Sequence, residues 1–428
     1  MSEPQQKNGV SRDVLTVMAG TAVLGVCGLV ILLFAARALG AADYAVFGLF
    51  WSALFFAVAV LSGVHQETTR AAASAGVGSG ERGTPLIRFA LVMALSAGVL
   101  IAATSPWWVR PTLGAEHGEL AVVVALGATG YTLTAVMCGV LAASGRWGAF
   151  SVLSMTEGLG RLAAVAIVLA LALGTTPLAW AVISVYPLML AIGAWSVLRR
   201  PGVTTRVPDS MGRLLSNTLH TVTAATAIAA LVNGFPLLMA TFAGDASQET
   251  VGAMTLAVML TRAPLLVPLV GAQGLLITMF ASPGRSPWPL ISKLLVGVAV
   301  VGVVLASLAG TLGPWVLRTA IGENFSLPGH VLAMLVVSSA ALGALSLSSP
   351  ALLAANQHVA YVIGWVVATA LAVFLLWVLP LSLELRAPLA LLIGPLVGLA
   401  WHLGALARHS TKDRRSDSHH YARGETAA

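Results

Sequence analysis

The stretch Ala35-Ala36-Arg37-Ala38-Leu39-Gly40-Ala41-Ala42-Asp43-Tyr44 joins the first long apolar run of the chain to the second. Its central glycine predicts a turn, and the charged residues Arg37 and Asp43 on either side fit the ends of two helices. A similar but weaker stretch, Met239-Ala240-Thr241-Phe242-Ala243-Gly244-Asp245, recurs about 204 residues later. We therefore expect two copies of one helical unit.

The composition indicates an integral membrane protein. Of the 428 residues, 58% are hydrophobic and 9% are charged, and the mean hydropathy is +0.91. Soluble domains have about 25% charged residues, and apolar runs of about 18 or more residues are typical of membrane helices. The net charge of +7 lies mainly in loops and tails, so we expect no nucleic-acid partner. Cys27 and Cys138 lie in apolar runs without metal-ligand spacing and are expected to be packing residues.

We expect an all-α integral membrane protein with about 12 transmembrane helices in two six-helix lobes. The run from Val14 to Ala36 is too long for the hydrophobic part of a cleaved signal peptide, so it is taken as the first span. Pro264 and Pro268 predict a kink or a break in the eighth span. The predicted spans are 14–36, 44–66, 86–106, 119–142, 149–173, 177–198, 214–242, 250–280, 290–312, 330–354, 359–381 and 387–407.

The distribution of basic residues predicts that both termini are cytoplasmic. With the N-terminus inside, 17 of the 23 Lys and Arg residues fall in cytoplasmic segments and 4 fall in external ones. Arg161 and Arg262 lie within spans. The predicted organisation is a cytoplasmic N-terminal segment at 1–13, an N-terminal lobe at 14–198, a cytoplasmic linker at 199–213, a C-terminal lobe at 214–407 and a disordered basic cytoplasmic tail at 408–428.

Two ungapped shifts support an internal repeat. At a shift of 204, Leu33, Ala36, Gly40 and Gly48 fall on Leu237, Ala240, Gly244 and Gly252. At a shift of 212, residues 141–146 fall on residues 353–358. With six spans on each side of the linker, these matches predict two parallel repeats about an axis along the membrane normal.

Several of these stretches resemble a known family. The 36–44 stretch resembles the end of the first helix in polysaccharide flippases of the multidrug/oligosaccharidyl-lipid/polysaccharide (MOP) exporter superfamily. Gln66-Glu67-Thr68-Thr69-Arg70 and Leu260-Thr261-Arg262-Ala263-Pro264 resemble actinobacterial members, and the Gly145-Arg146 turn is also typical. The resemblance implies a two-lobed bundle that alternates between inward-open and outward-open states. It also implies a polyprenyl-(pyro)phosphate-linked saccharide, or a related cell-envelope glycolipid precursor, as cargo.

Arg262 is the leading candidate for substrate binding. An ionisable residue within a span is costly and marks a functional site by default. By the resemblance, an Arg in this motif faces the central cavity, where its planar donor fork would suit a phosphate. Bonding to carbonyls exposed at the proline kink is the alternative. Arg37 is a second substrate-binding candidate, and its alternative is an interfacial anchor or a cap on a helix dipole.

Four further residues are candidates for gating or coupling. Glu67 could pair with Arg70 or Arg88 to close a gate, could carry a coupling proton, or could form a plain interfacial ion pair. Asp43 is expected to cap the second helix or to pair with Arg37. Glu157 and Arg161 are spaced i,i+4, so we expect a self-neutralising pair with a structural role.

Weaker polar candidates complete the set. Asn233 and Gln273 are expected as polar cavity or interhelical contacts for substrate. His220 and His402 could shuttle protons, although hydrogen-bonded packing is the simpler interpretation.

The sequence favours a transporter that is not an enzyme. It contains no Gly-rich phosphate loop, nucleophile elbow, paired His ligands or Cys cluster, so we expect no catalytic residues, cofactor or metal. Membrane lipids and the lipid-linked sugar are the expected partners, with envelope glycosyltransferases or a polymerase as further candidates. A proton- or cation-coupled small-molecule or drug exporter and a non-transporting scaffold of envelope biosynthesis are the alternatives.

Overall fold

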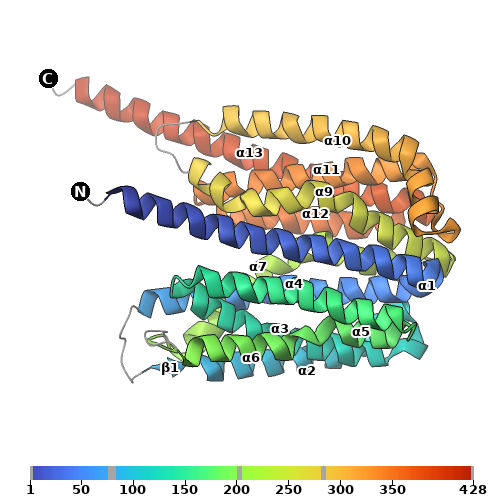
Figure 1. Ribbon diagram of the computed structural model, residues 1–428. Coiled ribbons are helices and arrows are strands. Elements are labelled where there is room, and N and C mark those ends of the chain that lie inside the picture. Colours follow the sequence, from blue (N-terminus) through green and yellow to red (C-terminus); the bar gives the residue numbers. More distant parts are fainter. Residues whose placement is uncertain (1–2, 76–82, 200–204, 281–285, 426–428) are drawn as a thin grey trace. The chain divides into compact units, whose positions relative to one another are not determined.

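The computed structural model describes residues 3–75, 83–199, 205–280 and 286–425, and most of these residues are helical (Figure 1). Two short strands, β1 (Thr84–Pro85) and β2 (Arg206–Val207), pair antiparallel. The helices are α1 (Glu3–Ala75), α2 (Leu86–Leu113), η1 (Ala115–His117), α3 (Glu119–Ala143), α4 (Trp147–Ala170), α5 (Thr175–Ile183), α6 (Val185–Leu198), α7 (Met211–Val232), α8 (Phe235–Thr241), α9 (Gln248–Phe280), α10 (Trp288–Val316), η2 (Leu317–Ile321), η3 (Glu323–Phe325), α11 (Gly329–Ala354), α12 (His358–Val378) and α13 (Leu383–Glu425).

The turn predicted at Gly40 divides α1 into two spans. Gly40 has φ 75° and ψ 172°, a non-helical conformation that separates two helical stretches of α1. A positive φ is unfavourable for residues with a Cβ atom, which explains the glycine. Ten stretches of the described residues are long and apolar enough to cross a membrane, and the 59-residue stretch Val17–Ala75 is one of them. If the two halves of this stretch are counted separately and the 33-residue α9 is added, the described residues contain the 12 spans that the sequence predicts.

The chain divides into two compact units. Unit 1 contains the residues up to Leu260 together with 315–327, and unit 2 contains 261–314 and the residues from Pro328 onward. The boundary falls inside α9, so the two halves of this helix belong to different units. The predicted lobes 14–198 and 214–407 are the parts that we expect to move in a transport cycle. They stay a prediction.

Unit 1 has a core that joins its first helices to α7. One cluster of buried side chains contains Leu61 of α1, Phe89 of α2, Val136 of α3, Val207 of β2 and Leu214 of α7. Between apolar surfaces in a membrane, association depends on close packing more than on the hydrophobic effect. Close fit within this cluster therefore stabilises the contact between α7 and the N-terminal helices.

In unit 2, small residues bring α12 and α13 into backbone contact. A Cβ atom at Gly394 would lie 2.5 Å from the Ala368 carbonyl oxygen, and one at Gly398 would lie 2.7 Å from the Gly364 carbonyl oxygen. Gly394 and Gly398 are four residues apart, the spacing of small residues at membrane helix contacts. The two helices therefore pack through these glycines.

The backbone supports the repeat and corrects one register. Gly145 (φ 65°) and Asn356 (φ 55°) occupy the same position in the turns after α3 and α11. The Arg146 N–H donates to Leu141 O, and the Gln357 N–H donates to Leu352 O in the same way. The equivalent residues are thus 211 apart, one fewer than the sequence match predicts. Repeated leucine and alanine give the shift of 212 one more identity than the shift of 211, so the sequence favoured the register that the backbone corrects.

One predicted element differs from the structure. The predicted span 214–242 is two helices, α7 and α8, that meet at Asn233. Of the kink or break predicted at Pro264 and Pro268, a break is not seen, because the single helix α9 includes both prolines. In the structure α13 continues as far as Glu425, and the disordered tail at 408–428 stays a prediction.

Candidate functional site

Unit 1 is closed at the Gly40 turn by contact between α1 and the first half of α9. We call Ala41, Tyr44, Ala45 and Gly48 of α1, with Gly252 and Thr255 of α9, the Gly40 seam. A Cβ atom at Gly252 would overlap the Ala41 carbonyl oxygen, and one at Gly48 would lie 2.8 Å from Thr255 Cγ2. Gly48 and Gly252 are the residues matched by the shift of 204, so each copy of the repeat contributes a glycine to the seam.

The segment after α10 covers the same end of unit 1. Arg37 Nη1 donates to the Ala320 carbonyl oxygen at 2.6 Å, at the end of the helix formed by α10 and η2. The ring of Tyr44 meets that of Phe325 edge-on, with centroids 5.7 Å apart. Asp43 is exposed and forms no ion pair with Arg37, so the predicted pairing is wrong for these two described residues. Arg37 binds a backbone carbonyl at a helix end here, which agrees with the alternative of a helix cap.

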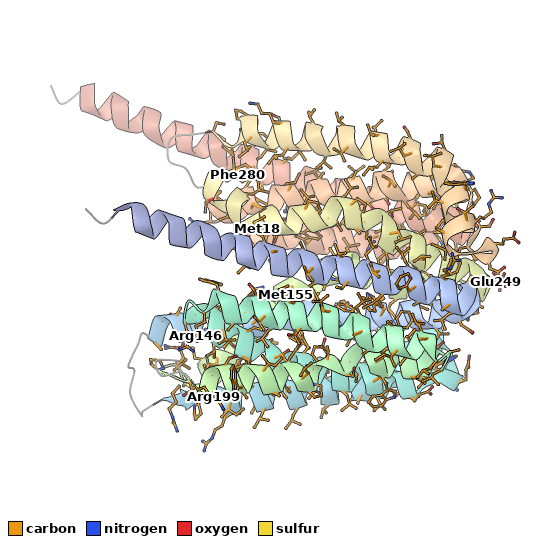
Figure 2. All side chains as sticks on the ribbon, in the orientation of Figure 1. Met18, Arg146, Met155, Arg199, Glu249 and Phe280 are labelled. Carbon is orange, nitrogen blue, oxygen red and sulfur yellow. The ribbon has the colours of Figure 1, made fainter. Side chains whose placement is uncertain are left out.

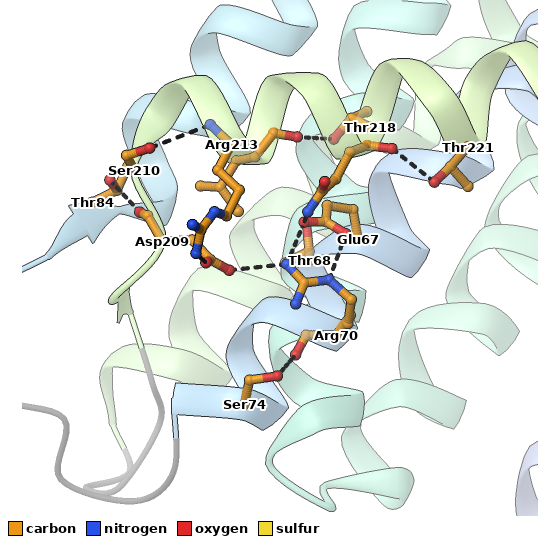
Figure 3. Close-up of polar contacts among 12 residues, drawn as sticks. Glu67, Thr68, Arg70, Ser74, Thr84, Asp209, Ser210, Arg213, Thr218 and Thr221 are labelled. Atoms are coloured by element: carbon orange, nitrogen blue, oxygen red, sulfur yellow. Dashed lines mark hydrogen bonds and ion pairs between the residues drawn. The ribbon is translucent and has the colours of Figure 1, made fainter.

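The opposite end of the second half of α1 carries a charge network (Figure 3). We call Glu67, Arg70, Asp209, Arg213 and Asn217 the Glu67 network. Glu67, with 4% of its side chain exposed, accepts two hydrogen bonds from Arg70, at 2.6 and 2.8 Å, and a third from Asn217 Nδ2 at 3.0 Å. Of the two partners predicted for Glu67, Arg70 is the one that the structure shows.

Asp209 extends this network to the residues before α7. Arg70 Nη2 lies 2.9 Å from its Oδ2, and Arg213 Nη1 lies 3.4 Å from its Oδ1. These hydrogen bonds, of which that from Arg70 is the stronger, hold the pKa of the Asp209 carboxyl below its ordinary value against the opposing effect of burial. Thr84 Oγ1 donates to the Asp209 carbonyl oxygen at 2.7 Å, beside the β1–β2 pair. The sequence analysis missed Asp209 and Asn217, although the i,i+4 spacing of Asp209 and Arg213 was a usable signal.

A second ion pair is buried in the helices of unit 1. Arg161 Nη2 donates to Glu157 Oε1 at 2.8 Å, as the i,i+4 spacing predicts. Arg161 also donates to the Val182 carbonyl oxygen at 3.0 Å and to the Tyr186 hydroxyl at 3.3 Å, and it lies 5.2 Å from the centroid of the Phe55 ring. These contacts neutralise and satisfy the guanidinium, which supports the structural role expected for the pair. Tyr186 was not singled out by sequence.

An apolar groove of about 750 Å³ lies beside this pair, between α3, α4, α5 and α6. Its lining includes Thr129, Trp180, Ser184 and one face of Tyr186. The two lining helices α5 and α6 meet at Ser184, because Pro187 has no N–H to donate to the Ile183 carbonyl. The groove contains none of the residues predicted to bind substrate.

Arg262 lies in the unit 2 half of α9, and its side chain is 6% exposed. The residue before it, Thr261, accepts a hydrogen bond from Ser339 Oγ of α11 at 3.4 Å. Gln273, on the same helix, is exposed. A guanidinium that stays charged is thus buried in a membrane helix, as the sequence predicts.

The other predicted residues lie in separate places. Asn233 marks the break between α7 and α8, and its carbonyl oxygen accepts a short hydrogen bond from Ser52 Oγ, which ties this break to α1. His220 is exposed, and His402 is fully buried in unit 2. Figure 2 shows Arg146 and Arg199 at one end of unit 1 and Glu249 at the other. The orientation predicted from the basic residues stays a prediction.

No protein-family model matches the chain. The chain is 37% identical over 403 residues to the uncharacterized protein Rv1510 of Mycobacterium tuberculosis (strain ATCC 25618 / H37Rv), covering 92% of each chain. It is 34% identical over 404 residues to the uncharacterized protein Rv3630 of the same strain, covering 93% of each chain.

Two kinds of solved structure share the fold. An inward-facing MATE multidrug resistance transporter of the MOP superfamily matches with a TM-score of 0.68 and 14% identity, over 93% of this chain and 99% of that one. The lipid II flippase MurJ, in an inward closed conformation, matches with a TM-score of 0.72 and 13% identity, over 92% of this chain and 87% of that one.

These neighbours are transporters and a flippase and are not enzymes. The apolar helices support a multi-pass membrane protein. The predicted fold is thereby confirmed, and the inner membrane, the superfamily membership and the actinobacterial type stay predictions. The chain belongs to one family with the two mycobacterial proteins, and its fold is that of the MOP superfamily.

Proposed function

We propose that this membrane transporter is a flippase for a polyprenyl-(pyro)phosphate-linked saccharide or a related cell-envelope glycolipid precursor. The observation that carries the proposal is the burial of Arg262 within α9, at 6% exposure. Burying a permanent charge in a membrane is costly, so retaining one favours a role that needs positive charge at that depth. A phosphate or pyrophosphate headgroup is the chemistry that an arginine fork recognises best.

In this proposal the headgroup enters from the cytoplasm and its phosphate binds Arg262, while the lipid tail stays in the bilayer. Arg37, Asn233 and Gln273 stay the predicted helper residues for the headgroup. Rocking of the lobes 14–198 and 214–407 then exposes the headgroup on the other side. Membrane lipids are partners throughout, and the glycosyltransferases or polymerase that make or use the precursor are further candidates.

The two ends of unit 1 are the proposed gates. With both termini cytoplasmic, the Gly40 seam is external and the Glu67 network is cytoplasmic. Glu67 and Asp43 would then act as gating residues at opposite faces, with the Glu157–Arg161 pair as a fixed element of the N-terminal lobe.

A second candidate function is the export of free small molecules. It is favoured by the fold shared with MATE multidrug resistance transporters. Organic cations are the expected cargo of a drug exporter, and a buried arginine disfavours them by charge repulsion. The flippase is therefore the first proposal.

The test is a leaflet assay in a deletion strain complemented at matched expression. It quantifies the polyprenyl-linked sugar that an external probe can reach, with wild type, Arg262→Ala and Arg262→Lys. We expect Arg262→Ala to lower externally accessible precursor by roughly tenfold or more, since a charge-assisted hydrogen bond contributes about 1.5–3 kcal/mol. Arg262→Lys should restore part of it. The control is Arg199→Ala, which removes an exposed arginine stacked on Trp195.

Unchanged sidedness in the deletion strain would reject the flippase and favour the exporter. Precursor that accumulates inside but is fully rescued by Arg262→Ala would keep the flippase and reject its proposed site.

A further inference from the structure

His402 is held on both ring nitrogens inside unit 2. The side chain is fully buried between α11, α12 and its own helix α13. Its Nδ1 lies 2.7 Å from Ser348 Oγ, and its Nε2 lies 3.1 Å from the Tyr361 carbonyl oxygen. A Cβ atom at Gly364 would overlap the ring, so α12 presents a glycine where the imidazole lies.

These partners determine the protonation of the ring in this conformation. A carbonyl oxygen only accepts, so Nε2 carries a hydrogen and donates to Tyr361. In the neutral ring, Nδ1 then accepts the hydrogen of the Ser348 hydroxyl. Ser348 Oγ also lies 2.7 Å from the Leu345 carbonyl oxygen, which is a second acceptor for the same hydrogen.

The same partners also accept a second proton. If Nδ1 gains a proton, it donates to Ser348 Oγ, and the Ser348 hydroxyl rotates to the Leu345 carbonyl. Every hydrogen bond is then satisfied without movement of a non-hydrogen atom. Burial of the charge is thus the main opposing factor, and a buried ion without a counter-ion costs several kcal/mol. Hydration of the site removes that cost.

No carboxylate is found among the described groups that face this ring. From α11 the facing side chain is Ser348, and from α12 it is Tyr361, whose ring stacks on His402 at a centroid distance of 6.2 Å. His358 at the start of α12 and Lys293 on α10 are exposed. On α13, Arg408 follows six residues later and is also exposed. None of these exposed groups offers a negative charge to an imidazolium in the closed site.

We propose that His402, with Ser348 and the Tyr361 carbonyl, is a proton-binding site that couples proton uptake to opening of the α11–α12–α13 contact. The neutral ring stabilises the closed contact, and the protonated ring stabilises a conformation in which water reaches it. Because a ligand shifts an equilibrium toward the state that binds it better, acidification favours the open contact. In a transport cycle, the proton bound at this site would be the coupling ion, and this consequence rests on the proposed function. The site itself can be tested without cargo.

The first experiment measures access to α11 in purified protein. Leu352 is fully buried one turn from Ser348, so Leu352→Cys in a Cys27→Ala, Cys138→Ala background reports opening through its maleimide reactivity. Rates are compared at about pH 7.5 and about pH 5.5, the range in which histidine changes charge. His402→Gln in the same background has the same thiol chemistry and no titrating ring.

We compare the change in the maleimide labelling rate between the two pH values in the two proteins. On acidification, the rate with His402 should rise by roughly tenfold relative to the rate with His402→Gln, because one pH unit of proton linkage corresponds to a factor of ten. Ser348→Ala should weaken this response. Ser346→Ala should leave it unchanged, because Ser346 donates to its own helix at Leu342. Equal pH profiles with His402 and with Gln would overturn the proposal.

A second measurement guards against a glutamine variant that fails to fold. Nitrogen-15 NMR of histidine-labelled protein, with the His402 signal identified by its shift in Ser348→Ala, reports the ring directly. We expect the neutral form with hydrogen on Nε2 at about pH 7.5 and a growing fraction of the doubly protonated form as the pH falls to about 5.5. A ring that stays neutral throughout this range would overturn the proposal even if the protein is a flippase.

Discussion

The two ends of unit 1 are held by different forces. The Gly40 seam has glycines and aromatic rings in contact, with Gly252 against the Ala41 carbonyl and Tyr44 against Phe325. The Glu67 network has charged side chains, of which Arg70 is 46% exposed and Arg213 is 71% exposed. Close packing is short-ranged and insensitive to salt, whereas partly exposed ion pairs are weak and screened.

This difference indicates how each end could open. A packed seam loses its contacts over a small displacement, so it is either closed or open. A charge network exchanges protein partners for water with little change in free energy. The Gly40 seam is therefore expected to set the energy difference between states, and the Glu67 network to adjust it.

The largest effect is expected from Gly252→Ala. The added methyl group overlaps a backbone carbonyl, which cannot rotate away as a side chain can. Overpacking costs about 1–3 kcal/mol, so the open seam should gain roughly 5- to 150-fold in population. Maleimide labelling of Ala45→Cys, a fully buried seam residue, measures this in a Cys27→Ala, Cys138→Ala background.

The matched control for that prediction is Gly297→Ala in α10. A Cβ atom at Gly297 meets nothing within 4 Å, so the change has the same effect on helix propensity without overlap. Slow Ala45→Cys labelling in both glycine variants would mean that the seam adapts to the methyl group. Fast labelling in both would mean that helix propensity, and not contact, controls the seam.

A smaller effect is expected from Glu67→Gln. The amide keeps the shape of the buried carboxylate but loses its charge and turns a donor toward Arg70 or Asn217. We expect the free energy of unfolding to fall by about 1–2 kcal/mol. This is at the low end for the loss of a buried charged partner, because Arg70 is partly exposed to water. Thermal unfolding in detergent at low and at high salt measures it, and the wild-type advantage should shrink as salt rises.

Arg213→Gln is the control within the same network. Its contact with Asp209 is long, at 3.4 Å, and its side chain is mostly exposed, so the loss should be below about 0.5 kcal/mol. Equal losses for Glu67→Gln and Arg213→Gln would show that burial of Glu67 adds nothing to the network.

The sequence predicted the parts of this molecule that depend on local pattern. Long apolar runs gave the spans, Gly40 gave the turn, and the i,i+4 spacing gave the Glu157–Arg161 pair. The Glu67–Arg70 pair was also within reach, because its residues are three apart on one helix. Each of these features is determined by residues within a few turns of one another.

The parts that failed depend on contacts between distant residues. Asn217 and Asp209 reach Glu67 and Arg70 only because α7 packs on α1. Asp43 was expected to cap the second helix or to pair with Arg37, but Arg37 bonds to a carbonyl 283 positions away in the chain. The break at Asn233 is an exception, because Asn233-Gly234 and Pro236 are local signals for it that the sequence analysis did not use. Sequence spacing contains no information about such partners.

The smallest predicted effect is the pH dependence of Asp209. Its pKa is lowered by Arg70 first and by Arg213 second, so the folded state binds this proton more weakly than the unfolded state. The resulting stabilisation is fully present above the unfolded value of about 4 and is lost as the pH falls through the lower folded value. Asp209→Asn should therefore lower the unfolding temperature slightly at neutral pH and at about pH 5, and the difference should shrink below about pH 4 and vanish below the lower folded value.

Detergent-solubilised wild type and Asp209→Asn, unfolded over this pH series, measure that difference. The same series in an Arg70→Gln background separates the two ends of the ion pair, since the aspartate then keeps only the weaker Arg213 contact. The difference between Asp209 and Asn should shrink at every pH in that background. If it persists unchanged, the Asp209 carboxylate acts through Arg213 and not through Arg70.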